Sequence, residues 1–503
     1  MPPTTRAEST NYSETSRHAD VMAFIAALSA QNDRRLHVTS IGVSPGGRDL
    51  PLLVLSAHSF TTPAASRRAG IPIVLIQSGI HAGEVEGKEG CLSLVRDLLH
   101  GPHGDVLAHL TLVVLPLFNP DGNDAIDPGN RKLYLPKLSG QLGPESGVGT
   151  RVNGAGINLN RDYLRQDAPE MRLWHERLWS VWEPDLTLDN HATNGSIHRF
   201  AMTWDIPHTV ESGCQAPIDY MRHQLTPAVA AAVRSGHGYE SGWYGNFVED
   251  ERCMDADREV NPGTAVAEGW MTYPHHPRFG SNYRGLCGRM DLLLEAYAYI
   301  SFADRVGAAY AWMLETLRYV AAHADEVRAT VAASRTPPSR IAIRYRLDRL
   351  AEPVAILTRS PRVLDGAPAS VSLPHLARFV GTATVDRPRA YAVSPRLAAA
   401  LRRHGLRVEG SERALEVEVP TVSGYGATGG RAILEAASTE DVRVSWKADR
   451  RSLPEGWGLV PTDHPHGAVA VYLCEPESDD GPLENDLIEA SPAGSELAVW
   501  RVP

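Results

Sequence analysis

Residues 72–100, PIVLIQSGIHAGEVEGKEGCLSLVRDLLH, decide the fold class of this chain. The run PIVLIQS (72–78) is short and apolar, as is typical of a buried strand, and residues 85–100 have helical periodicity. A second apolar run, LTLVVLPL (110–117), follows and is stopped by Asn-Pro-Asp-Gly. This order of strand, helix and strand predicts a sheet with helices packed against it.

The same alternation continues on both sides of this unit. It predicts a mostly parallel or mixed sheet with helices on both faces, that is, an α/β fold. The further elements that we expect are helices at 21–31, 168–182 and 302–334 and strands at 50–56 and 184–190.

The length of 503 residues favours two domains. The segment SRTPPSR (334–340) is typical of a linker, because adjacent prolines stop a helix. Beyond it, runs such as RIAIRYRL and ALEVEVPTV alternate apolar and polar residues between turns. We therefore predict an α/β domain over 1–335 and a mainly β accessory domain over 341–503.

Composition and charge exclude several classes of protein. The net charge is −11 without a Lys/Arg-rich run, which argues against nucleic acid as a partner. No run approaches the ~20 apolar residues that cross a bilayer. The polar N-terminus carries no apolar signal region, so we expect a cytoplasmic protein. The cysteines form no CxxC pair, which favours reduced, buried thiols over a thiolate zinc site; they are Cys91, Cys214, Cys253, Cys287 and Cys474.

His81 and Glu84 follow the strand PIVLIQS directly. Imidazole nitrogen and carboxylate oxygen are both good zinc ligands, and glycine at 79 and 83 permits a tight turn between them. Alone this HxxE pattern is weak, because a surface His and Glu at that spacing are far commoner.

Two further residues stand at the ends of apolar strands. His191 ends PDLTLDNH and would complete a two-His, one-carboxylate site with a position left for water, although a hydrogen-bonded core histidine is the ordinary alternative. Glu295 ends DLLLE, where an unpaired carboxylate is costly. It would take a proton from metal-bound water, or else form a salt bridge to Arg289 or Arg305.

Taken together, these segments resemble the zinc metallocarboxypeptidase family, the clan of carboxypeptidases A and B, and specifically a bacterial-type member with a C-terminal β domain. The motifs occur in the family's order across about residues 10–330. They are the HxxE of 81–84, Asn119-Pro120-Asp121-Gly122, Asn160-Arg161 in GINLNRDY, His191, and Glu295 in LLLEAYAY.

The resemblance implies an α/β/α sandwich around a mixed sheet and a site with one Zn²⁺ ion. His81, Glu84 and His191 would hold zinc, and Glu295 would act as general base and then general acid.

Asn160 and Arg161 match the pair that grips the substrate's terminal carboxylate. A planar guanidinium can hold a carboxylate through two parallel hydrogen bonds. The alternatives are an ion pair of Arg161 with Asp162 and a loop cap by Asn160.

Three positions depart from the family pattern. The place of the oxyanion arginine holds Tyr134, so Arg131 or Arg151 would supply that charge, and we favour Arg131. Asn158 replaces the aspartate that orients the first zinc histidine, which would make His81 less basic.

The third departure is the substrate-capping tyrosine, which has no clean counterpart. The segment YPHHPRFGSNY (273–283) offers Tyr283 as a donor, and also Arg278. Its His275-His276 pair is expected to be solvated, as loop histidines usually are.

The leading hypothesis is a metallocarboxypeptidase that cleaves the C-terminal residue from peptides. The alternative is a zinc amidase or deacylase acting on a small N-acyl amino acid. Both substrates carry a free carboxylate, so Asn160 and Arg161 fit either. A catalytically silent binding module, with the β domain docking a partner, is the third hypothesis.

Overall fold

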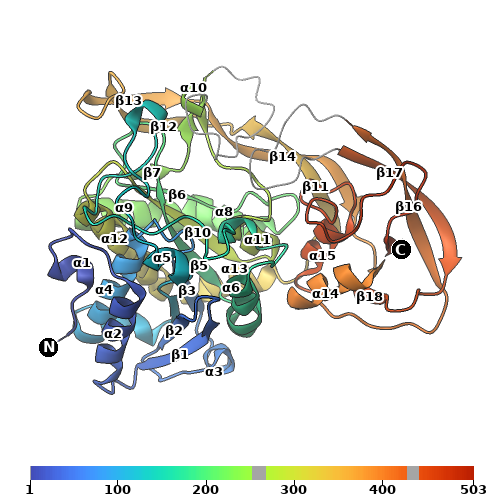
Figure 1. Cartoon of the computed structure of the whole chain (residues 1–503), viewed down its shortest axis with the longest axis horizontal. Helices are drawn as coiled ribbons and strands as arrows, with labels where there is room; N and C mark the ends of the chain where they lie inside the picture. Colours follow the sequence, from blue (N-terminus) through green and yellow to red (C-terminus); the bar gives the residue numbers. More distant parts are fainter. Residues whose placement is uncertain (1, 252–267, 427–440) are drawn as a thin grey trace.

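A mixed eight-stranded sheet forms the centre of the molecule (Figure 1). The computed structural model describes residues 2–251, 268–426 and 441–503. The strand order is β1-β2-β4-β3-β5-β10-β6-β7. The strands are β1 (Leu36–Val43), β2 (Asp49–Leu55), β3 (Ile73–Ser78), β4 (Thr111–Leu115), β5 (Leu186–Thr193), β6 (Met202–Asp205), β7 (Ser241–Trp243) and β10 (Met290–Tyr297).

The middle of the sheet, β4-β3-β5-β10, is parallel, whereas β1, β2 and β6 pair antiparallel with their neighbours in β2, β4 and β10. The predicted mixed sheet is therefore confirmed. Its parallel strands all end at one edge, and residues that follow them lie close together there.

Alternate residues of each strand feed two separate hydrophobic cores. Ile73 and Leu75 of β3 belong to one core, and Val74 and Ile76 to the other. The second core packs under α2 (His18–Ser29), α4 (Glu86–His100), α9 (Thr226–His237), α12 (Phe302–Ala322) and α13 (Ala324–Ala333). The first lies under α6 (Pro169–Leu173), a π-helical turn (Trp174–Trp179) and α7 (Ser180–Trp182). Helices thus cover both faces, which confirms the α/β/α sandwich.

The single long helix predicted over 302–334 is wrong, because two helices occupy this segment. His323 leaves the helical conformation, with φ −123° and ψ 31°. Asp325 and Glu326 then fall in the first turn of α13, where acidic side chains favour a helix start.

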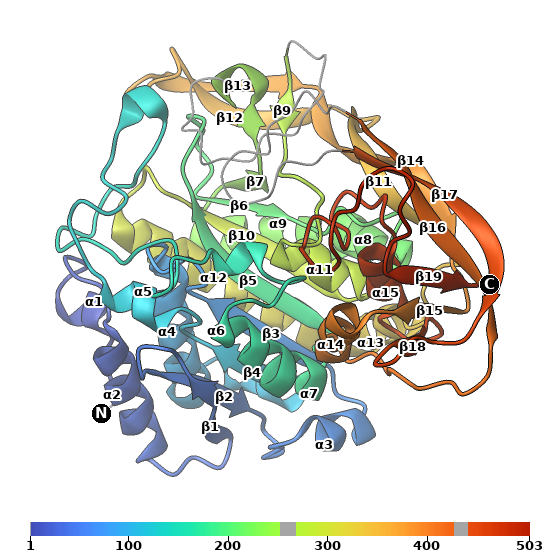
Figure 2. The same cartoon turned by 45° about the vertical axis from the view of Figure 1, so that its right-hand side comes forward.

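The C-terminal part contains several further sheets, as predicted (Figures 1 and 2). The short strand β9 (Trp270–Met271) pairs with β14 in one of them, so segments before and after residue 340 share that sheet. The other strands of these sheets and the helices of the C-terminal part are β8 (Asn246–Phe247), β11 (Arg340–Arg349), β12 (Val354–Ser360), β13 (Ala367–Leu373), β14 (His375–Asp386), β15 (Ala390–Val393), α14 (Pro395–Arg403), β16 (Leu415–Gly426), β17 (Asp441–Arg451), β18 (Gly458–Pro461), α15 (Gly467–Cys474) and β19 (Val499–Val502).

His404, at the end of α14, joins the C-terminal part to the first core. Its ring nitrogens lie 3.0 Å from the Leu164 carbonyl oxygen and 2.9 Å from the Tyr283 hydroxyl. The first core contains residues from both sides of the 334–340 segment, among them Tyr163 and Leu401. The domain boundary at 335/341 stays a prediction.

Cys91, Cys287 and Cys474 are buried free thiols, Cys214 is a partly buried one, and Cys253 lies outside the described residues. Among the described residues, no helix combines the length and apolar character that a membrane span requires.

We expect His404→Ala to lower the thermal unfolding midpoint. The substitution leaves the Leu164 carbonyl and the Tyr283 hydroxyl without their buried partner, at about 1–3 kcal/mol for each such group. Arg407→Ala is the control, because that side chain is 83% exposed and an exposed substitution changes stability by about 0.5 kcal/mol or less. Calorimetry that finds equal midpoints for the two variants contradicts the role of His404.

Candidate active site

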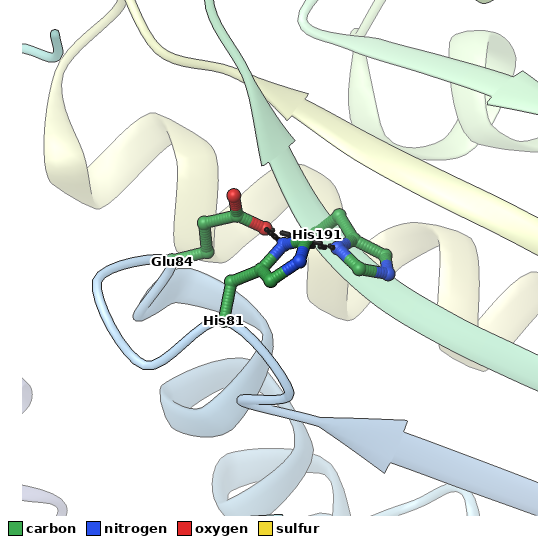
Figure 3. A group of neighbouring side chains, drawn as sticks. All are labelled: His81, Glu84 and His191. Carbon is green, nitrogen blue, oxygen red and sulfur yellow. Dashed lines mark hydrogen bonds and ion pairs between the residues drawn. The ribbon is translucent and has the colours of Figure 1, made fainter. Parts of the chain in front are cut away.

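His81, Glu84 and His191 converge although they come from two distant segments (Figure 3). The Nδ1 atoms of the two histidines are 3.2 Å apart. Glu84 Oε2 lies 3.2 Å from His81 Nδ1 and 3.0 Å from His191 Nδ1. All three side chains are buried.

The local sequence explains this convergence. Gly79 turns the chain out of β3 with φ +69°, a conformation that other residues rarely adopt. A turn closed by the Glu84 N–H and the His81 carbonyl, 3.0 Å apart, then brings the two side chains to one side before α4 begins. A Cβ at Gly83 would lie 2.8 Å from Arg131 Cδ, so glycine also permits this close approach.

The three donor atoms fit a zinc ion. Ligands at about 2.0–2.1 Å from a tetrahedral ion are separated from one another by roughly 3.3–3.4 Å, close to the distances found here. The outer nitrogen of each ring faces a polar side chain. His81 Nε2 lies 3.1 Å from Asn158 Oδ1, which confirms the predicted partner, and His191 Nε2 lies 3.5 Å from Asp189 Oδ1.

The charges around these side chains suit cation binding. Burial and the nearby Arg151 lower the pKa of His81 to about 3, so its ring is neutral. Burial alone would raise the pKa of Glu84, but His81 and Arg131 hold it well below its ordinary value. Burial also lowers the pKa of His191, yet Asp189, Glu84 and Glu295 raise it well above normal. The same negative charges would stabilise a bound metal ion.

Asp189 anchors this group and was not predicted. It lies two residues before His191 and therefore on the same face of β5. It forms an ion pair with Arg284, which also pairs with Asp291, and all three side chains are buried. The sequence signal was the charged residue at alternate positions of apolar strands, as in Leu-Asp-Asn-His.

The strand register places Glu295 beside His191. The two residues are direct neighbours on the parallel strands β10 and β5, so their side chains lie on the same face. Glu295 lines the cavity together with His81 and Glu84. The alternative partners Arg289 and Arg305 lie 3.4 Å from Glu183 and 3.3 Å from Glu86, respectively.

A cavity of about 510 Å³ opens from these residues, and Asn160 and Arg161 line it. The Arg161 guanidinium lies 3.9 Å from the centre of the Phe279 ring, and Asn160 Oδ1 accepts a hydrogen bond from the Gly280 N–H at 2.9 Å. Asp162, the alternative partner of Arg161, instead accepts two backbone hydrogen bonds at 2.8 and 2.9 Å.

Both candidate oxyanion arginines reach the site. Arg131 donates from all three of its nitrogens: to Gln141 at 2.6 Å, to Glu84 Oε1 at 3.0 Å and to the Ala192 carbonyl at 3.0 Å. Arg151 Nη1 lies 3.1 Å from His81 Nδ1, and its side chain is 39% exposed.

Tyr283 does not reach the cavity, which corrects its predicted contact with substrate. The side chain is fully buried, and its hydroxyl is 2.9 Å from His404 Nδ1. Tyr244 and Tyr273 line the cavity in its place. Tyr273 is the first residue of the segment 273–283. Spacing along the sequence does not show which of the two tyrosines in this segment reaches the cavity.

His275 is buried rather than solvated. Its Nε2 lies 2.8 Å from Asp479 Oδ2, and these two residues with His276 form a second group of closely spaced donor atoms. Arg278 similarly pairs with Asp480 at 2.9 Å. The loop that carries Tyr273 and Phe279 is thereby held by the C-terminal part.

The comparisons with known proteins identify one family. Residues 21–244 match the model of the zinc carboxypeptidase family, a range that contains His81, Glu84, Asn160, Arg161 and His191 but not Glu295. No curated protein matches the sequence.

Several solved structures are similar over about three-fifths of the chain. A metallo-carboxypeptidase from Burkholderia cenocepacia shares 17% identity over 60% of this chain and 69% of its own, with a TM-score of 0.40. A metallo-carboxypeptidase from Pseudomonas aeruginosa, in complex with (2-guanidinoethylmercapto)succinic acid, shares 17% identity over 62% of this chain and 69% of its own. Its TM-score is 0.41. Carboxypeptidase A from Helicoverpa armigera shares 17% identity over 64% of this chain and 75% of its own, with a TM-score of 0.41.

We expect Asn158→Ala to weaken zinc binding about 10–100-fold, because the His81 ring loses the acceptor that orients it. Asn158→Asp is the matched variant: it keeps the acceptor and adds a negative charge, so its zinc affinity should equal or exceed that of the parent. Competition with a chelator measures both. An unchanged affinity for Asn158→Ala rules out this role.

Proposed function

We propose that the chain removes single residues from the C-terminus of peptides, because residues 21–244 match the model of the zinc carboxypeptidase family. His81, Glu84 and His191 would hold one zinc ion, and Glu295 would be the catalytic base. The observation that carries this proposal is the group of three donor atoms beside a cavity that Glu295, Asn160 and Arg161 line.

The substrate's terminal carboxylate is assigned to Arg161 and Asn160. The ring of Phe279 supports the flat face of the guanidinium, and a guanidinium edge can hold a carboxylate through two parallel hydrogen bonds. The Gly280 N–H orients the Asn160 side-chain oxygen, so its NH₂ group is the one available to donate. A peptide held in this way presents its last peptide bond at a fixed depth in the cavity, and that produces single-residue cleavage.

Zinc, when bound, supplies a Lewis acid that polarises the scissile carbonyl and makes water a nucleophile at neutral pH. Glu295 then accepts the proton of the attacking water and returns it to the amine that leaves. Its place beside His191 brings its carboxylate next to the ligand group.

Arg151 is the better candidate for the oxyanion. Every nitrogen of Arg131 already donates to a protein acceptor, one of them to Glu84, so Arg131 supports a metal ligand. The Arg151 side chain is more exposed, at 39% against 16%, and can turn toward a substrate oxygen.

We expect Glu295→Gln to retain zinc and to lose turnover by about 10²–10⁴-fold, because the amide cannot accept the proton. The experiment follows a peptide ladder by mass spectrometry together with zinc content; Glu416→Gln, at an exposed position of β16, is the control. Turnover near the parental rate overturns the mechanism. If the parent protein leaves peptides intact but hydrolyses N-acyl amino acids, the deacylase hypothesis replaces the carboxypeptidase hypothesis.

We expect substitutions of Arg151 and Arg131 to affect different quantities, kcat for the first and zinc affinity for the second. Arg151→Met should lower kcat about 10²–10³-fold while zinc affinity is kept, as for the loss of an oxyanion donor. Arg131→Met should weaken zinc binding instead, since Glu84 Oε1 loses its nearer arginine, at 3.0 Å against 3.5 Å for Arg151. The reverse pattern in kcat and zinc affinity would restore Arg131 to the oxyanion role.

A further inference from the structure

The cavity carries a charge opposite to that of the whole chain. Among the described residues, its walls hold two carboxylates, Glu84 and Glu295, and five cationic side chains, although the net charge of the chain is −11. The cations are Arg131, Lys132, Lys137, Arg151 and Arg161. The proposed reaction uses the three arginines and both carboxylates, so Lys132 and Lys137 remain without a task.

Lysine is rare in this sequence. Four of its 49 basic residues are lysine: Lys88, Lys132, Lys137 and Lys447. Lys88 is buried under the N-terminal segment, and Lys447 is exposed on β17. The remaining two both line the cavity.

The two lysines stand on an ordered wall. Backbone hydrogen bonds fasten its ends, from the Gln141 N–H to the Arg131 carbonyl at 2.8 Å and from the Gly195 N–H to the Leu138 carbonyl at 3.0 Å. Both lysine side chains are exposed, and neither makes a hydrogen bond or an ion pair within the described residues. Their charge is therefore directed at solvent and at whatever enters the cavity.

We infer that the substrates are peptides with acidic side chains in their last two residues. The inference rests on the proposed function and names the substrate class of the same site. Arg161 takes the terminal carboxylate, which leaves two ammonium groups for the side-chain carboxylates that follow it into the cavity. A lysine ammonium is a compact charge on a flexible stem, so it can follow carboxylates at slightly different positions. The positive cavity also attracts acidic peptides from solution.

The test uses two peptides that are identical except for a Glu-Glu or a Gln-Gln end. Glu and Gln have the same shape, so the ratio of their kcat/KM values reports charge alone. We expect the parent to prefer the Glu-Glu peptide by roughly tenfold or more, and added salt to reduce that preference. The variant Lys132→Glu/Lys137→Glu should bring the ratio to one or below. Lys447→Glu/Arg450→Glu makes the same charge change at exposed positions of β17 and should leave the ratio unaltered.

The outcomes separate the two proposals. Equal cleavage of both peptides by the parent overturns the inference and leaves the carboxypeptidase function standing. Cleavage of neither peptide by zinc-loaded protein counts against the function itself. If the variant Lys132→Glu/Lys137→Glu keeps the preference, with zinc content and unfolding midpoint at parental values, the two lysines do not bind the acidic side chains. If that variant does not fold, the preference of the parent and its salt dependence still decide the substrate class.

Discussion

The pairing of Asp189 on β5 with Arg284 on α11 (Gly280–Leu286) is the interaction on which the site depends. Both side chains are buried, and Asp189 also accepts a hydrogen bond from Gln77 Nε2 at 3.0 Å. Removing one partner of a buried ion pair costs about 3–5 kcal/mol, because the other charge is left uncompensated. A shift in the register of β5 would break this pair, so the pair fixes the position of His191 two residues further on.

The alternation of side chains along the strands explains why a core and a polar site lie on one face. On the face of the first core, β3 presents Ile73, Leu75 and then Gln77, and β5 presents Asp189 and then His191. On β3 the apolar residues thus precede the polar one, whereas on β5 this face is polar from Thr187 onward. The parallel strands end at one edge, which gathers the polar residues there without any long-range signal in the sequence.

Periodicity and short motifs were sufficient for the sheet, the helices on both faces and the three candidate ligands, because each depends on local spacing and chain order. Asp189, Tyr244 and Tyr273 were not found, since only the paired register and the folded loops bring them to the site. Tyr283 failed for the same reason: the sequence shows that a tyrosine is near, but not which face it turns to. The break between the two helices at His323 was not predicted, because the apolar pattern continues across it.

The C-terminal part bears on the site through one wall of the cavity. The loop with Tyr273 and Phe279 follows β9, which pairs with β14, and His275 and Arg278 of that loop pair with Asp479 and Asp480. Phe279 in turn supports Arg161. A displacement of the C-terminal part would therefore move the group assigned to the substrate carboxylate while the histidines on the sheet stayed in place. In the proposed mechanism, substrate binding and metal binding would therefore depend on different parts of the chain, so that the first could vary without loss of the second.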